Sequence, residues 1–250
     1  MSADWTLRRG PLLLQHLAPP ADRCHPATPP TPSSCTPCAA SGGGSSTVGC
    51  ECGLVSFTFA VAQPRTRISC CCVDCRQKCR WAQAQGGPPL PADVVSFDAP
   101  MDLVYFPNAF RVDKGAEHVA FYRLRPDARS INLVSTCCHT TLLVDNVNYH
   151  EAKDMEADDG MQVLLFPAVI KLSTNMIDLT SASLNFATDF PPDKLAALEA
   201  ALAANPPPLA PPPPPPTVPD VPEGWTTFNR LRGGRVPTVL GLVSGEEIEA

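Results

Sequence analysis

This sequence lacks long apolar runs and has few basic residues for its number of acidic ones. Its 250 residues contain no run of 18 apolar residues, so the sequence predicts no transmembrane helix. Lysine and arginine number 19 against 25 aspartates and glutamates, which gives a net charge of −6 at pH 7. Surfaces that bind nucleic acid are usually basic, so we expect neither nucleic acid nor a membrane as a partner.

Several common catalytic motifs are also missing. The sequence has no G-x-S-x-G, no glycine-rich phosphate loop followed by Lys-Ser or Lys-Thr, and no H-E-x-x-H. These absences argue against the hydrolases, nucleotide-binding proteins and zinc peptidases that carry such motifs.

Proline, by contrast, is abundant, and its 30 copies crowd two parts of the chain. Segments rich in proline and glycine bury too little apolar surface to offset their ordering entropy. We therefore divide the chain into five parts. They are a disordered leader (1–46), a folded domain (47–190), a helix (191–205), a proline-rich linker (206–222) and a tail of unassigned role (223–250).

The two low-complexity segments leave alternatives open. The linker contains six consecutive prolines, 211–216, and predicts a polyproline II spacer that could also dock an SH3- or WW-type groove. The start of the leader contains two arginines and a short leucine run, which suits either an organellar transit peptide or an unstructured segment. A cytoplasmic and an organellar location are thus both compatible with it.

Between the low-complexity segments, hydrophobic alternation and turn residues predict a mostly β domain. A short helical turn is expected from residue 74, and a late helix over 191–205. The expected strands and extended segments are 55–61, 66–70, 91–100, 101–110, the hairpin arms 118–124 and 130–135, and 162–173.

Most of the twelve cysteines lie in three groups. Adjacent cysteines reach disulfide geometry only with strain, whereas spacings of two and three residues suit a tetrahedral metal such as zinc. In "CCCVDCR", three thiolates can cap one face of a zinc ion and leave its fourth position to water or a substrate thiol. The groups are Cys50 and Cys52; Cys70, Cys71, Cys72, Cys75 and Cys79; and Cys137 and Cys138.

At these residues the chain resembles the family of glutathione-dependent formaldehyde-activating enzymes and centromere protein V. The resemblance rests on "GCECG" at 49–53, on "CCCVDCR" at 70–76, and on a hairpin that leads into "TCCHTT" at 136–141. It implies a Mss4-like, β-tent fold with one or two zinc ions. By the resemblance, Cys50, Cys52 and Cys138 hold a structural ion, and the triplet Cys70, Cys72 and Cys75 holds a second ion near a glutathione site.

Three departures from the family pattern bear on these ligands. Ser135 stands where the first cysteine of the last pair is expected, so the fourth ligand is Cys137, His139 or none. His139 itself stands at a usual glycine, and Cys71 at a frequent histidine. Cys71 and Cys79 are predicted either as small buried thiols or as spare ligands or redox partners.

The resemblance implies a carbon–sulfur lyase that acts on S-hydroxymethylglutathione or a related thiol adduct. Zinc at Cys70, Cys72 and Cys75 would hold the substrate thiol, so the partner is a small thiol or aldehyde, with glutathione as co-substrate. Arg76 would meet a carboxylate of glutathione, lower a thiolate pKa, or lie in solvent. The alternative is a non-catalytic zinc module that binds another protein.

Overall fold

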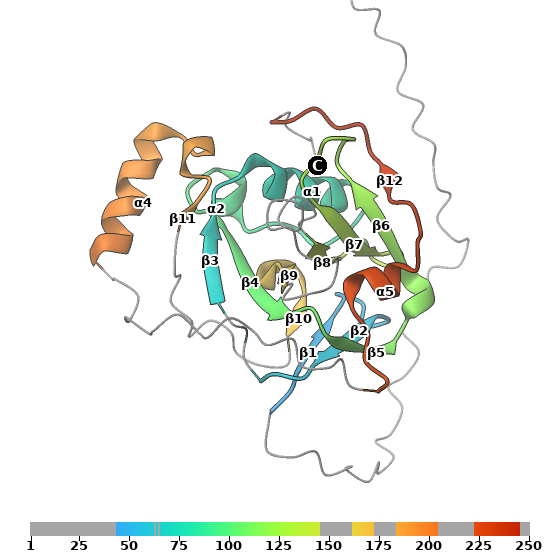
Figure 1. The fold of residues 1–250 in the computed structure, drawn as a ribbon. Coiled ribbons are helices and arrows are strands. Elements are labelled where there is room, and N and C mark those ends of the chain that lie inside the picture. The colour runs from blue at the N-terminus through green and yellow to red at the C-terminus, as the bar shows by residue number, and fades with distance from the viewer. Residues whose placement is uncertain are drawn as a thin grey trace, which may run out of the picture. The chain divides into compact units, whose positions relative to one another are not determined.

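The computed structural model describes residues 44–62, 64, 66–145, 162–172, 184–204 and 223–245. The leader and the proline-rich linker lie outside these residues, so the predictions made for them remain predictions. Cys35 and Cys38, which have the spacing of half a zinc site, lie in that leader. Within the described part, the chain is mostly β, as predicted, with two sheets and a few short helices (Figure 1).

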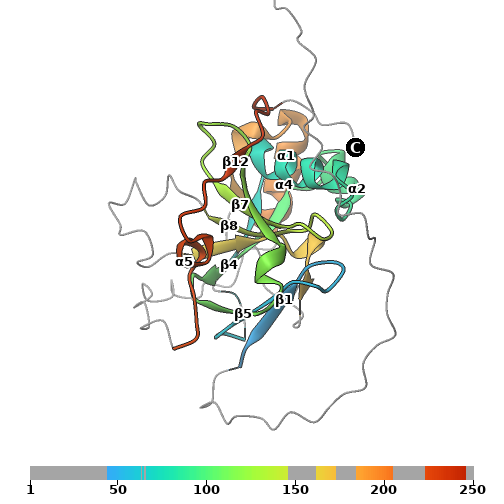
Figure 2. The same ribbon diagram turned by 90° about the vertical axis from the view of Figure 1, so that its right-hand side faces the viewer.

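The two sheets differ in size. The smaller sheet has the strand order β10-β1-β2-β5 and is antiparallel throughout. Its strands are β10 Lys171–Leu172, β1 Ser46–Gly49, β2 Ser56–Phe59 and β5 Phe110–Lys114. It lies below the strands of the larger sheet in both views (Figures 1 and 2).

The larger sheet has the order β11-β3-β4-β9-β8-β7-β6-β12. Its six inner strands are antiparallel, and β11 and β12 pair in parallel at the two edges. Its strands are β11 Leu184–Asn185, β3 Thr66–Cys70, β4 Met101–Pro107, β9 Gln162–Leu165, β8 Thr141–Asp145, β7 Ile131–Ser135, β6 Val119–Arg123 and β12 Thr238–Val239.

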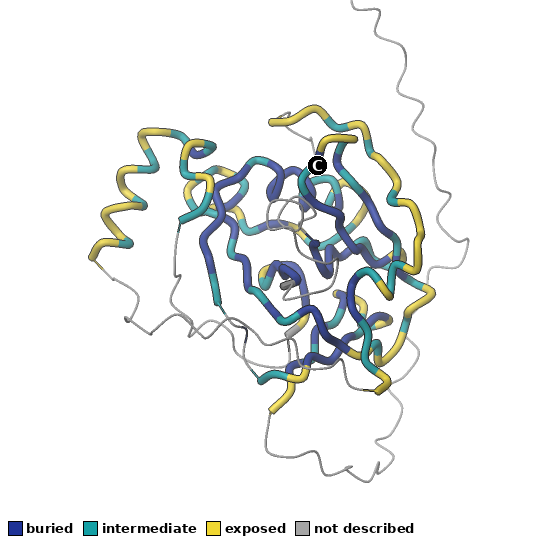
Figure 3. Tube along the Cα trace, in the orientation of Figure 1, coloured by how far each residue is buried: buried dark blue, intermediate teal, exposed yellow. Residues whose placement is uncertain are grey.

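Phenylalanines from neighbouring strands form a large part of the core. The Phe59 ring lies 4.5 Å from that of Phe106 and 5.6 Å from that of Phe110, centroid to centroid, and all three are fully buried. The alternation of Val55, Phe57 and Phe59 was the signal for a half-buried strand, and these side chains do point into the core. Buried residues follow the strands of both sheets (Figure 3).

The hairpin prediction is confirmed, because β6 and β7 pair antiparallel with Val119 opposite Ser135. The strand predicted at 91–100 is wrong, since α2 Ala92–Val95 is helical there. The valines favoured a strand, but Pro91 suits a helix start and the Asp93 carboxylate accepts the backbone N–H of Val94. The local hydrogen bonding thus outweighs the strand propensity of the two valines.

Two longer helices flank the sheets. The helical turn expected from residue 74 extends to a full helix, α1 Val73–Ala84. The late helix is confirmed as α4 Pro192–Ala204, and none of its residues is fully buried. No helix of the described residues is both long and apolar enough to cross a membrane.

The tail left unassigned by the sequence packs on the domain. Phe228, at the start of α5 Phe228–Arg232, is fully buried and lies edge-on to Phe121 at 5.5 Å. Beyond it, β12 adds to the edge strand β6, and the Leu240 N–H donates to the Arg123 carbonyl across 2.9 Å. The C-terminal segment therefore closes one edge of the larger sheet.

Candidate metal centres

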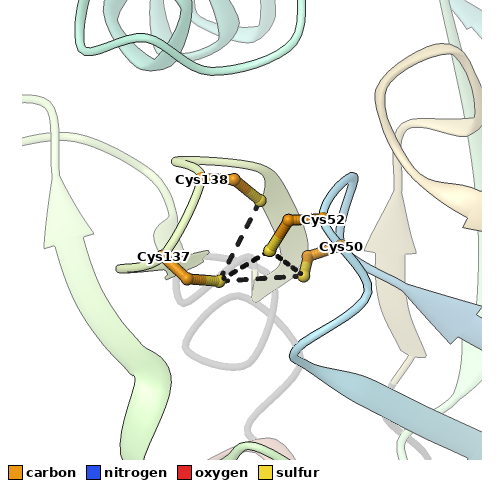
Figure 4. A group of neighbouring side chains, drawn as sticks. All are labelled: Cys50, Cys52, Cys137 and Cys138. Atoms are coloured by element: carbon orange, nitrogen blue, oxygen red, sulfur yellow. Dashed lines mark hydrogen bonds between the residues drawn. The ribbon is translucent and has the colours of Figure 1, made fainter. Parts of the chain in front are cut away.

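Four cysteines from two distant turns come together at the first centre. Cys50 and Cys52 lie in the turn between β1 and β2, and Cys137 and Cys138 lie in the turn between β7 and β8 (Figure 4). Their sulfur atoms all lie within 4.8 Å of one another. This group joins the smaller sheet to the larger one.

The sulfur spacing fits a tetrahedral zinc ion. Zn–S bonds of about 2.3 Å place the sulfurs of a tetrahedron about 3.8 Å apart. The observed Sγ–Sγ distances are 3.3 Å from Cys52 to Cys137, 3.6 Å from Cys50 to Cys52, 3.8 Å from Cys50 to Cys137 and 4.0 Å from Cys137 to Cys138. A disulfide would need about 2.05 Å, so the group is arranged as a ligand set.

Of the residues considered for the fourth position, Cys137 lies in the group and could supply the fourth sulfur. Ser135, the departure from the family pattern, lies behind the group with its hydroxyl 3.4 Å from the Cys138 sulfur, and it accepts the Thr140 N–H across 3.0 Å. His139 is not part of the group, and its backbone is left-handed at φ 50°. A left-handed residue at this position explains why glycine suits it. A fourth cysteine sulfur is thus present in the group, although Ser135 replaces the expected cysteine.

One thiol of this group is poised to ionise. A hydrogen bond from Cys50, helped by those from Ser135 and Thr140, lowers the pKa of Cys138 to about 3. The same contact with Cys138, together with burial, raises the pKa of Cys50, and burial raises the pKa of Cys137 to about 12. Negative charge in this group is thus favoured at Cys138, and a divalent ion would favour the loss of further thiol protons.

The second centre is the triplet predicted from the sequence. Cys70 ends β3, Cys72 is the N-cap of α1, and Cys75 lies in the first turn of that helix. Their sulfurs all lie within 4.8 Å of one another, and those of Cys70 and Cys75 are 3.7 Å apart. Because this spacing also matches that of zinc-bound thiolates, the triplet could hold a metal ion through three sulfurs.

The helix N-terminus favours negative charge at Cys72. Its sulfur accepts the Cys75 N–H across 3.4 Å, where a serine or aspartate oxygen usually caps a helix. Hydrogen bonds from the Cys70 and Cys75 thiols lower the pKa of Cys72 to about 2. The hydrogen bond to Cys72 raises the pKa of Cys70 to about 12, and hydrogen bonds to Cys70 and Cys72 hold the pKa of Cys75 well above its usual range.

A pocket of about 50 Å³ opens beside this triplet. That is room for a few water molecules or a small fragment of a substrate. Its lining combines the three cysteines with Lys78, Arg129 and other charged, polar and apolar side chains. The first centre has four protein sulfurs, whereas this one has three and borders a pocket.

Three other residues singled out in the sequence are buried and lie outside both cysteine groups. Cys71 and Cys79 are buried outside both cysteine groups, and burial raises the pKa of Cys79 to about 12, as expected of inert thiols. Arg76 is buried as well and donates to the backbone carbonyls of Val94 and Ala99. Its guanidinium carbon lies 3.8 Å from the centroid of the Phe97 ring. These contacts commit both terminal nitrogens of Arg76, so its predicted contact with glutathione gains no support.

Comparison of the chain with protein-family models, with curated proteins and with solved structures finds no match. The two centres are therefore interpreted from their own geometry.

Sequence reasoning missed Lys78 and Ser130, which face each other in the pocket. The Lys78 ammonium donates to the Ser130 hydroxyl across 3.1 Å. One signal was available, because Lys78 follows Cys75 by three residues and so shares its face of α1. Ser130 gave no such signal, since it comes from the start of a distant hairpin arm.

Proposed function

We propose that this protein is a zinc-dependent carbon–sulfur lyase that releases formaldehyde from its adduct with a small thiol. The proposal rests on one observation, which is the three-cysteine group at the α1 N-terminus beside a pocket with a buried lysine. Structural zinc sites are usually closed by four protein ligands, whereas catalytic sites keep one position open. The motif resemblance to formaldehyde-activating enzymes supports the same reaction class and a β-tent fold.

Zinc held by Cys70, Cys72 and Cys75 would keep a thiol in its thiolate form by lowering its pKa. The chain's own residues supply the rest of the site. Leu103, Val144 and Leu164 give the pocket apolar walls, and Lys78 and Arg129 give it positive charge. In the cleavage direction the hydroxyl proton of the adduct leaves, the oxygen forms the carbonyl double bond, and the carbon–sulfur electron pair returns to sulfur.

The first experiment measures zinc per chain for the wild type and for Cys72→Ser. Serine is a good N-cap, so this variant should keep α1 while losing one of two ions. Cys50→Ser is the matched change at the other centre and should lose its ion together with much of the stability. Two ions in the wild type and one in folded Cys72→Ser would support a separate, dispensable second ion.

Turnover then separates the lyase from the alternative, a zinc module that binds another protein. Wild-type protein should accelerate formaldehyde release from S-hydroxymethylglutathione and from the adduct of a smaller thiol, whereas Cys72→Ser should not. If fully zinc-loaded protein did not accelerate formaldehyde release, the non-catalytic module would be the better interpretation. A wild type without zinc would overturn both.

A further inference from the structure

Lys78 is a buried cation with one hydrogen-bond acceptor among the described residues. The residue is 4% exposed, and its ammonium donates to the Ser130 hydroxyl and lies 5.8 Å from the Phe166 ring centroid. An ammonium has three N–H donors. Among the described residues, no carboxylate forms an ion pair with it. The negative charge beside it is that of the cysteine group, since the Lys78 charge adds to the hydrogen bonds from Cys70 and Cys75 that lower the pKa of Cys72.

The other charges around the pocket are already committed. Asp74 lines the pocket but accepts from Arg125 at 2.9 Å and 3.0 Å, so its charge is neutralised. The Arg129 guanidinium lies 4.1 Å from the centroid of the Phe186 ring, which is 43% exposed. Lys78 is thus the buried cation of this lining. Ser130 is its one hydrogen-bond acceptor in the described part of the chain, so its ammonium is able to donate to a bound anion as well.

The proposed reaction creates negative charge on oxygen in this pocket. When the adduct R–S–CH2–OH loses its hydroxyl proton to water, the charge lies on oxygen, two bonds from sulfur. As the carbon–sulfur bond breaks, that charge moves to sulfur and the oxygen becomes the carbonyl of formaldehyde. A fixed cation near the oxygen lowers the energy of the charged intermediate, because the cation is already in place when the charge forms.

We propose that the Lys78 ammonium, held in position by Ser130, binds the substrate oxygen while the substrate sulfur lies against Cys70, Cys72 and Cys75. This inference rests on the proposed function and adds to it a catalytic residue and a ligand class. The ligand class is a small thiol that carries a negatively charged oxygen within two carbons of its sulfur. Mercaptoacetate has this form and mimics the charged adduct without reacting.

The test compares two thiols on the zinc-loaded full chain by isothermal titration calorimetry. Mercaptoacetate should bind the wild type at least about tenfold more tightly than neutral 2-mercaptoethanol, because a hydrogen bond to a charged group is worth more than a neutral one. Lys78→Met should abolish this difference and leave 2-mercaptoethanol binding unchanged. Ser130→Ala should reduce it, and Lys114→Met, which removes an exposed lysine on β5, should preserve it.

Turnover gives an independent readout. Lys78→Met should lower kcat for formaldehyde release by about 100-fold or more, with zinc content unchanged. The inference would be overturned if the two thiols bound the wild type equally, or if the preference survived in Lys78→Met. Lyase activity in the same preparation would still support the proposed function. If neither thiol bound the zinc-loaded wild type, the inference and the proposed function would both be overturned. Should Lys78→Met not fold, the wild-type comparison and Ser130→Ala decide the question.

Discussion

The sulfur atoms of Cys52 and Cys137 lie 3.3 Å apart, although 85 residues separate the two cysteines in the chain. Cys52 belongs to a turn of the smaller sheet and Cys137 to a turn of the larger one. A metal ion shared between them would link the two sheets directly. Its binding free energy would then be part of the free energy of folding.

The first prediction follows from this link. Cys137→Ser should remove one zinc ion per chain and lower the free energy of unfolding by more than about 3 kcal/mol, since a structural zinc site contributes directly to folding. Zinc analysis and urea unfolding measure both effects. Retention of both ions at wild-type stability would show that Cys137 is not a ligand.

His139→Gly is the matched control in the same turn. His139 is outside the cysteine group and has a φ of 50°, a conformation that costs less for glycine than for histidine. The change should therefore leave zinc content unaltered and raise the free energy of unfolding by roughly 0.5–1 kcal/mol. Loss of an ion from His139→Gly would instead assign the imidazole as a ligand.

The second prediction concerns Arg76. Arg76→Met should lower the free energy of unfolding by roughly 2–4 kcal/mol, because it removes the hydrogen bonds that the buried guanidinium donates to the carbonyls of Val94 and Ala99. Thiol affinity of the folded fraction should stay within about twofold of the wild type, as the guanidinium is committed to the fold. A stable Arg76→Met variant with greatly weakened glutathione binding would restore the role first predicted for this residue.

How far the sequence could predict these features depends on the range of the contacts involved. Cys70, Cys72 and Cys75 are close in the chain, so their spacing alone indicated a shared ion. The first centre needed the fold, because only the approach of two turns distinguishes Cys137 from His139 as the fourth group member. Lys78 and Ser130 are 52 residues apart, and no local pattern links a helix to that hairpin arm.

Errors in secondary structure have a similar origin. Val94 and Val95 favour a strand by side-chain type, yet the turn made by Pro91 and Asp93 decides the conformation. The tail beyond residue 223 carried too few periodic apolar residues to predict. Its position is fixed by pairing with the edge of β6, a contact across more than 100 residues.

The third prediction separates inert from accessible thiols. Burial raises the pKa of Cys79 to about 12, so at pH 8 this side chain is held in its thiol form. Iodoacetamide should therefore leave Cys79 unmodified in the folded, zinc-loaded protein and modify it only after unfolding, as followed by peptide mass spectrometry. Exposed Cys52 is the internal comparison, and it should react once a chelator has removed zinc. Rapid modification of Cys79 in the folded protein would instead favour the redox role.

The last prediction concerns the C-terminal segment. Phe228 is fully buried against Phe121, and its N–H donates to the Asn108 side chain across 2.8 Å. Phe228→Ala should lower the free energy of unfolding by about 3–5 kcal/mol, because it leaves a cavity in the core. Val236→Ala, at a site 89% exposed in the same segment, should change it by less than about 0.5 kcal/mol. Urea unfolding of the two variants compares them directly. Equal, small effects would mean that the segment does not pack on the domain in solution, and the edge of β6 would then be open to another strand.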